Sequence, residues 1–345
     1  MLQFIGRILG WLRGETLKLL ILASVLLLIW GMLAPVPTLL WWLSRNTESL
    51  SFKRNQTKKL LSENEPTTAT KGQKIDCYIV FLPGVGDFSP NELTPGEEFF
   101  LNRLVQLNPN CVVVSDVFPY SLYNESLGGE RLTAPLWRAA KNAKGWLANA
   151  HMLIQIRNLW RFAISADERY GPIYNQGIAS TIIDRMNAAH PIPRSQQQPL
   201  KIILIGTSGG AQVALGAVPH LERSLNAQSI VVSVGGCFDG NTGFETVDRV
   251  YHLQGRRDWV EDITRITFAS RWSWTVGSPF NQARRQGRYK VIKTGPHAHD
   301  GDEGYFGMAS VGASQTTYVE LTLEKVNRLP IWSEQKRVDK TKPQL

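Results

Sequence analysis

The stretch that most constrains the fold runs from Leu200 to Ala217, where an apolar run enters a glycine-rich corner. The run Leu-Lys-Ile-Ile-Leu-Ile is followed at once by Gly206-Thr207-Ser208-Gly209-Gly210 and then by Ala-Gln-Val-Ala-Leu-Gly-Ala. A short β-branched run that ends in glycines predicts a buried strand and a turn, and the alanines and leucine favour a helix. We therefore expect a strand, a sharp corner carrying Ser208, and a helix.

The corner matches the pattern of a nucleophile elbow. Gly206, Ser208 and Gly210 form Gly-x-Ser-x-Gly, and glycines suit the flanking positions because the strand and the helix pass close together there. The corner holds the serine hydroxyl clear of the sheet, and the Gly209 amide faces the developing negative charge. In this context the chain resembles the α/β-hydrolase superfamily. The alternative interpretation is an ordinary turn with a Thr-Ser helix cap.

Composition narrows the class of protein. With 345 residues and 43% hydrophobic content, the chain can bury one large core or two modest ones. The cysteines, Cys77, Cys111 and Cys237, are widely spaced and fit no metal-ligand pattern, which argues against a disulfide framework and favours a reducing compartment. The net charge of +9 favours a neighbouring anionic membrane surface over nucleic acid.

The N-terminus reads as a membrane anchor. The stretch from Leu19 to Ser44 contains no charged residue. It is long enough to cross a bilayer core, which needs about 20 residues, and Trp41-Trp42 suits the membrane interface. A cleaved signal peptide is the alternative, but the apolar run is too long for one. Residues 1–44 are therefore expected to form an uncleaved single-pass anchor with an amphipathic start. A slight excess of Lys and Arg after the span favours a cytoplasmic globular domain.

The rest of the chain divides into a flexible linker at 45–72, an α/β domain at 73–330 and a polar tail at 331–345. The fold class expected is an α/β-hydrolase fold, with a mostly parallel central sheet flanked by helices. Its strands are expected at Ile75–Leu82, Cys111–Val117, Leu200–Ile205, Ser229–Val234, Arg249–Gln254 and Tyr289–Lys293. A tryptophan-rich, basic insertion at about 124–172 predicts a helical cap, which suits a membrane interface or an acyl-chain pocket as well as plain core packing.

The loop after the first expected strand reads Pro83-Gly84-Val85-Gly86-Asp87. It resembles the His-Gly-x-Gly loop of α/β-hydrolases, with Pro83 where many members have His. The resemblance implies that the Val85 amide is an oxyanion donor beside that of Gly209. The alternative is a tight turn into a helix at 98–106.

Asp258 lies just beyond the strand at Arg249–Gln254, where the resemblance places the triad acid. A buried carboxylate there would hold a histidine in the right tautomer and stabilise its imidazolium. Asp239, after the preceding strand, is the second candidate. Asp262 is the third, because it should lie within the following helix.

Two histidines, His297 and His299, follow the last expected strand, so the order Ser, Asp, His agrees with the resemblance. Spacing from the strand end slightly favours His297, whereas the following pattern Gly304-Tyr305-Phe306-Gly307 slightly favours His299, so the residues do not separate them firmly. The other histidine should face the loop exterior or line the cleft. A metal site formed by these histidines with Asp300 and Asp302 is the alternative, but no cluster of further ligands accompanies them in the sequence.

The resemblance implies a serine hydrolase acting through Ser208, Asp258 and one histidine. The expected anchor and cap make it a membrane-anchored esterase or lipase acting on an acyl ester. The resemblance implies no cofactor and no metal. The expected partners are the lipid bilayer and a lipid-like substrate, without nucleic acid. An acyltransferase or peptidase of the same fold, or a non-catalytic scaffold that recruits partners through the insertion, are the alternatives.

Overall fold

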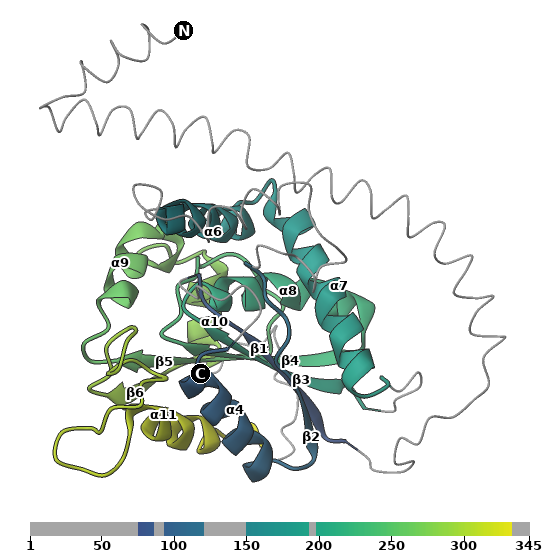
Figure 1. Ribbon diagram of the computed structural model, residues 1–345. Coiled ribbons are helices and arrows are strands. Elements are labelled where there is room, and N and C mark those ends of the chain that lie inside the picture. Colours follow the sequence, from purple (N-terminus) through teal and green to yellow (C-terminus); the bar gives the residue numbers. More distant parts are fainter. Residues whose placement is uncertain (1–74, 86–92, 121–149, 193–197, 333–345) are drawn as a thin grey trace, which may run out of the picture. The chain divides into compact units, whose positions relative to one another are not determined.

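The computed structural model describes residues 75–85, 93–120, 150–192 and 198–332 (Figure 1). The expected anchor and linker lie outside these ranges, as do the start of the expected insertion and residues 333–345 of the tail. Within the described ranges, no helix combines the length and the apolarity that a bilayer crossing requires.

The described residues contain a six-stranded sheet in the order β2-β1-β3-β4-β5-β6, and every neighbouring pair of strands is parallel. The strands are β1 (Cys77–Leu82), β2 (Cys111–Val114), β3 (Leu200–Thr207), β4 (Ala227–Val234), β5 (Arg249–Gly255) and β6 (Tyr289–Gly295). The expected α/β class with a parallel sheet is therefore confirmed.

Helices cover both faces of the sheet. They are α4 (Pro95–Leu107), α6 (Ala150–Ala166), α7 (Gly171–Ala189), α8 (Gly210–Ser224), α9 (Trp259–Thr267), the 3₁₀ helix η3 (Ala269–Arg271), α10 (Pro279–Arg285) and α11 (Tyr318–Asn327). Helices α4 and α11 contact each other on one face, and α7 and α8 contact each other on the opposite face (Figure 1). Parallel strands buried on both faces read as continuous apolar runs, and every residue of β1 is indeed buried.

Alternation along the strands divides the core into two layers. Side chains of successive strand residues point to opposite faces, so Ile79 and Phe81 of β1 lie with Ile203 and Ile205 of β3 on the side of α4 and α11. Phe100 of α4 belongs to the same cluster. Burial of these apolar side chains fixes α4 and α11 against the sheet.

Helix α4 confirms the expected helix at 98–106 but begins earlier. Thr94 is its N-cap, and the Thr94 and Glu97 side chains each accept a hydrogen bond from the other's backbone amide. Pro95 follows at the first helical position, where its missing N–H costs nothing. This capping box starts the helix ahead of the apolar residues that indicated it.

The expectation against disulfides is wrong for two of the three cysteines. Cys77 and Cys111 form a disulfide between the first paired residues of β1 and β2, with Cα atoms 4.6 Å apart. Parallel pairing brings the two strand starts side by side, although 34 positions separate them in the sequence. Cys237 is a free thiol.

Candidate active site

The expected site residues gather at one edge of the sheet. Val85 follows β1, Ser208 follows β3, Asp258 follows β5, and His299 lies in the loop after β6. Because all of these strands are parallel, their carboxyl ends share one edge, where loops from several strands converge. The fold therefore brings together side chains that lie far apart in the sequence.

Ser208 has the strained backbone of a nucleophile elbow. Its φ is +46°, and among the described residues it is the single non-glycine residue with positive φ. Such a conformation costs on the order of 1–3 kcal/mol and persists only where the surroundings fix it. Hydrogen bonds fix it here: the Ser208 amide donates to the Val234 carbonyl at 3.1 Å, and the Cys237 amide donates to the Ser208 carbonyl at 2.9 Å.

The two flanking glycines are required by close packing. A Cβ on Gly206 would lie 2.6 Å from the Cα of Ala211, and a Cβ on Gly210 would lie 2.1 Å from the carbonyl oxygen of Leu82. Helix α8 begins directly after Gly209 without a side-chain cap hydrogen bond. The interpretation of the motif as a Thr-Ser cap is therefore wrong, and the glycine spacing follows from the close approach of α8 to β3 and β1.

His299 links the serine to the acid. Its Nε2 lies 3.0 Å from the Ser208 Oγ, and its Nδ1 lies 3.0 Å from the Asp258 Oδ1. A neutral imidazole that donates from Nδ1 to the carboxylate has an unprotonated Nε2, which accepts the serine proton. The arrangement can therefore move a proton from the Ser208 hydroxyl to His299 while Asp258 holds the ring.

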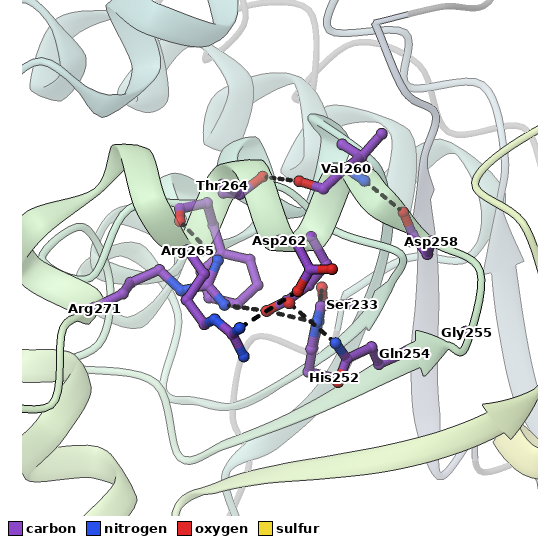
Figure 2. A network of polar contacts seen from close by, with 12 residues as sticks. Ser233, His252, Gln254, Gly255, Asp258, Val260, Asp262, Thr264, Arg265 and Arg271 are labelled. Atoms are coloured by element: carbon purple, nitrogen blue, oxygen red, sulfur yellow. Dashed lines mark hydrogen bonds and ion pairs between the residues drawn. The ribbon is translucent and has the colours of Figure 1, made fainter.

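Asp258 is buried and ionised. It is the N-cap of α9, where its carboxylate accepts a hydrogen bond from the Val260 amide at 3.0 Å (Figure 2). Burial alone would raise the pKa of Asp258, but the hydrogen bonds from His299, Tyr305 and the Val260 amide outweigh it and hold that pKa below its ordinary value. The carboxylate therefore stays charged at neutral pH and can stabilise an imidazolium.

Tyr305 supports the acid, and sequence reasoning missed this role. Its hydroxyl donates to the Asp258 Oδ2 at 2.8 Å and accepts from the Gly255 amide at 2.7 Å. Burial, followed by the nearby Asp258 charge, raises the Tyr305 pKa above its ordinary value, so the phenol remains a donor. The Gly-Tyr-Phe-Gly pattern that favoured His299 was the available signal.

His297 lies in the interior, so the expectation that it faces the loop exterior or the cleft is wrong. Its side chain is fully buried, its Nε2 lies 3.0 Å from the Tyr318 carbonyl oxygen, and its ring stacks on Tyr305 with centroids 5.2 Å apart. Burial lowers the pKa of His297. The side chain thus supports Tyr305 from behind and does not contact Ser208.

The two alternative acids serve other purposes. Asp239 accepts hydrogen bonds from the amides of Asn241 and Thr242 and from the Gln212 side chain, which shapes the turn after β4. Asp262 is exposed on α9 and pairs with Arg265 at 3.4 Å (Figure 2). In the described part of the chain, no group of three or more His, Cys, Asp and Glu side chains is arranged to hold a metal ion.

The loop after β1 lies directly against the elbow. A Cβ on Gly84 would lie 3.0 Å from the Cβ of Ser208, and one on Gly209 would lie 3.2 Å from the Cγ2 of Val85. Among the described residues, neither the Val85 amide nor the Gly209 amide has a hydrogen-bond acceptor. Asn158 of α6 donates to the Val85 carbonyl at 3.2 Å and so helps to position this loop. Both amides can therefore donate to a new negative charge beside Ser208.

Aromatic side chains surround the Gly209 position. The Tyr120 hydroxyl donates to the Gly209 carbonyl at 3.0 Å, and a Cβ on Gly209 would lie 3.2 Å from Phe162 of α6. Phe162 in turn contacts Phe268, with ring centroids 6.2 Å apart. Helix α6, which belongs to the expected insertion, thus supplies part of the site wall. The aromatic residues of that insertion were the signal, but its sequence did not say which of them reach the site.

A second polar network lies buried beneath α9 (Figure 2). Ser233 and His252 are joined by a 2.9 Å hydrogen bond, and Glu261 pairs with Arg271 at 2.8 Å and accepts from Gln254 at 3.0 Å. Burial lowers the pKa of His252 to about 3, so this ring is neutral at ordinary pH. The hydrogen bond from Gln254 of β5 to Glu261 of α9 ties α9, and with it the Asp258 cap, to β5. Ser233 and His252 are fully buried in the same network.

No family model, characterised protein or solved structure matches this chain significantly.

Proposed function

We propose that this chain is a serine hydrolase that cleaves a carboxylic acyl ester. Ser208 is the nucleophile, His299 the general base and Asp258 the acid that orients it. The observation that carries the proposal is the position of the His299 imidazole. Its Nδ1 lies 3.0 Å from the Asp258 Oδ1, and its Nε2 lies 3.0 Å from the Ser208 Oγ. The strained backbone of Ser208 supports it, because strain at a reactive residue is common in active sites.

The reaction proceeds in two acyl-transfer steps. His299 removes the Ser208 proton as the Oγ attacks the ester carbonyl, and the amides of Val85 and Gly209 hold the oxyanion. The protonated ring then gives its proton to the departing alcohol, which leaves an acyl group on Ser208. Water attacks this acyl-enzyme with His299 again as base, and the carboxylic acid is released.

The topology supports membership of the α/β-hydrolase superfamily, which the sequence resembles. The nucleophile follows β3, the acid follows β5 and the base follows β6, so the order Ser, Asp, His agrees with that resemblance. The loop of Val85 lies against the elbow from the adjacent strand β1, as an oxyanion donor must. The aromatic wall of Tyr120, Phe162 and Phe268 favours an apolar acyl or alcohol group.

We also propose that residues 19–43 anchor the enzyme in a membrane, because that stretch is apolar and uncharged. The disulfide between Cys77 and Cys111 favours an oxidising compartment for the catalytic domain. Cytosolic proteins rarely keep disulfides, so the disulfide outweighs the small excess of positive charge after the anchor, which favoured the cytoplasmic side. An exposed thiol introduced as Leu107→Cys in a Cys237→Ser background, labelled with a membrane-impermeant reagent on intact and opened cells, would test the orientation.

Labelling with a fluorophosphonate probe tests the chemistry, because it requires an activated serine and an oxyanion hole. Ser208→Ala should abolish both labelling and ester hydrolysis. Ser233→Ala is a matched control, since that serine also contacts a histidine but is fully buried, and this variant should still be labelled. Labelling that persists in Ser208→Ala would contradict the assignment of the nucleophile.

A further inference from the structure

Helix α9 buries polar side chains and exposes apolar ones, which is the reverse of an ordinary surface helix. Its polar residues Glu261 and Thr264 are buried, whereas the large apolar residues Trp259, Ile263 and Ile266 are exposed. A surface helix normally turns its apolar stripe toward the core. The spacing of the three exposed residues, i, i+4 and i+7, places them along one side of the helix. The buried salt bridge of Glu261 with Arg271 holds the helix in this orientation.

The exposed apolar surface continues beyond the helix. Trp274 is 73% exposed and Val276 is 59% exposed, in the turn that follows η3. The Trp272 indole donates to the carbonyls of Arg265 and Ile266, and its ring lies 5.0 Å from that of Trp274. These contacts tie the turn to the end of α9. The surface of Trp259, Ile263, Ile266, Trp274 and Val276 is called the α9 face below.

The composition of the α9 face is that of a membrane interface. Tryptophan is enriched where a protein meets lipid headgroups, and isoleucine and valine suit the acyl region beneath. One exposed arginine borders the face: Arg285 donates to the Val276 carbonyl at 2.9 Å. The exposed Asp262 of α9 is paired with Arg265 at 3.4 Å. The charge of Arg285 complements lipid phosphate groups.

We propose that the α9 face docks the catalytic domain on the surface of a lipid bilayer. The occupant is a bilayer, and not a protein, because the same chain carries the uncharged stretch from Leu19 to Ser44, which is long enough to enter one. A domain tethered at that stretch meets the bilayer at high local concentration, so a modest apolar face is sufficient to orient it.

The face is continuous with the site. Phe268, two residues after Ile266, contacts Phe162, and Phe162 borders the Gly209 position beside Ser208. Leu159, one turn earlier on α6, is 59% exposed. Docking therefore turns an apolar approach to Ser208 toward the lipid, and the substrate would be an acyl ester that resides in the bilayer. This substrate class rests on the proposed function, whereas the docking itself does not.

Depth measurements on the full chain test the docking. The fluorophore NBD is attached at Ile266→Cys in a Cys237→Ser background, and the protein is reconstituted into vesicles of phosphatidylcholine and phosphatidylglycerol. Leu107→Cys is the matched control, because that exposed aliphatic residue ends α4 next to the starts of the strands, at the edge of the sheet away from the site. Emission from the label at 266 should shift to the blue and be quenched by spin-labelled lipid, while the label at 107 should show neither change.

The outcomes separate the possibilities. Equal quenching at the two positions, or none at 266, would overturn the proposal. A blue shift at 266 that needs no lipid and grows with protein concentration would also overturn it, because a second copy of the chain would then cover the face. Repeating the measurement in Ser208→Ala separates docking from chemistry: the quenching at 266 should persist even if the proposed hydrolase activity proves wrong.

Discussion

Tyr305→Phe is the sharpest test of how the acid is supported, because it removes one oxygen atom and leaves the ring. The lost hydroxyl donates to the Asp258 Oδ2 at 2.8 Å and accepts from the Gly255 amide at 2.7 Å. The phenylalanine ring still stacks on His297, so no cavity larger than the hydroxyl forms. The substitution therefore isolates two hydrogen bonds.

The magnitude follows from those two bonds. A hydrogen bond to a charged group contributes about 1.5–3 kcal/mol, and a buried amide left without an acceptor costs about 1–3 kcal/mol. The two losses share one oxygen and do not simply add, so we expect the free energy of unfolding to fall by about 2–4 kcal/mol. If His299 shifts with Asp258, the rate of labelling should fall about 10- to 100-fold, since about 1.4 kcal/mol corresponds to tenfold.

The pH dependence gives a second readout. Because the folded-state pKa of Asp258 lies below its unfolded value, its contribution to stability is present above the unfolded pKa and is lost as the pH falls through the folded pKa. The Tyr305 hydroxyl is one cause of the lowered pKa, so Tyr305→Phe should raise it. The stability difference between the two proteins should therefore be larger at pH 7 than in acid, below both pKa values.

Urea unfolding at neutral and acidic pH, together with the rate of fluorophosphonate labelling, measures these effects. Tyr318→Phe is the control, since its hydroxyl accepts a 3.0 Å hydrogen bond from Arg257 and does not contact Asp258. That variant should lose at most about 1 kcal/mol and should be labelled at the original rate. Unchanged stability and labelling in Tyr305→Phe would refute the view that Tyr305 positions the acid.

Three further predictions concern the histidines and the elbow. His299→Ala should reduce ester turnover as severely as loss of the serine, whereas His297→Ala should chiefly lower the free energy of unfolding, by about 2–4 kcal/mol, because it empties a buried site. Turnover assays and urea unfolding separate the two effects, and the reverse pattern would contradict the assignment. His252 has a folded pKa of about 3 and should bind its proton mainly in the unfolded chain, so the free energy of unfolding should fall as the pH drops below its unfolded pKa of about 6.5. His252→Gln should make the free energy of unfolding depend less on pH in this range, and an unchanged pH dependence would exclude His252 as the cause. Gly210→Ala places a Cβ 2.1 Å from a β1 carbonyl oxygen and should lower the stability measured by thermal unfolding by at least about 1–3 kcal/mol. Gly277→Ala, which has open space around its Cβ, should leave stability nearly unchanged, and equal losses in the two variants would contradict close packing at Gly210.

Local patterns in the sequence predicted the six strands and several of the helices, and the resemblance to α/β-hydrolases pointed to the candidate residues. The β-branched run before Gly206 predicted β3, and the loops after the later strands indicated Asp258 and a pair of histidines. These predictions succeed because strand burial and turn chemistry depend on neighbours along the chain. The parallel sheet was expected from the resemblance to the α/β-hydrolase superfamily, and the six described strands form one.

Only the tertiary structure decided which histidine meets Ser208 and what surrounds the site. His297 and His299 lie two positions apart, yet one is buried behind Tyr305 and the other contacts the serine, because the loop path between them depends on packing against α11. The pairing of Cys77 with Cys111 likewise depends on strand register, a contact between distant segments that no local pattern encodes. The outward apolar side of α9 belongs to the same class: its residues were visible in the sequence, but the buried polar network that turns them outward was not.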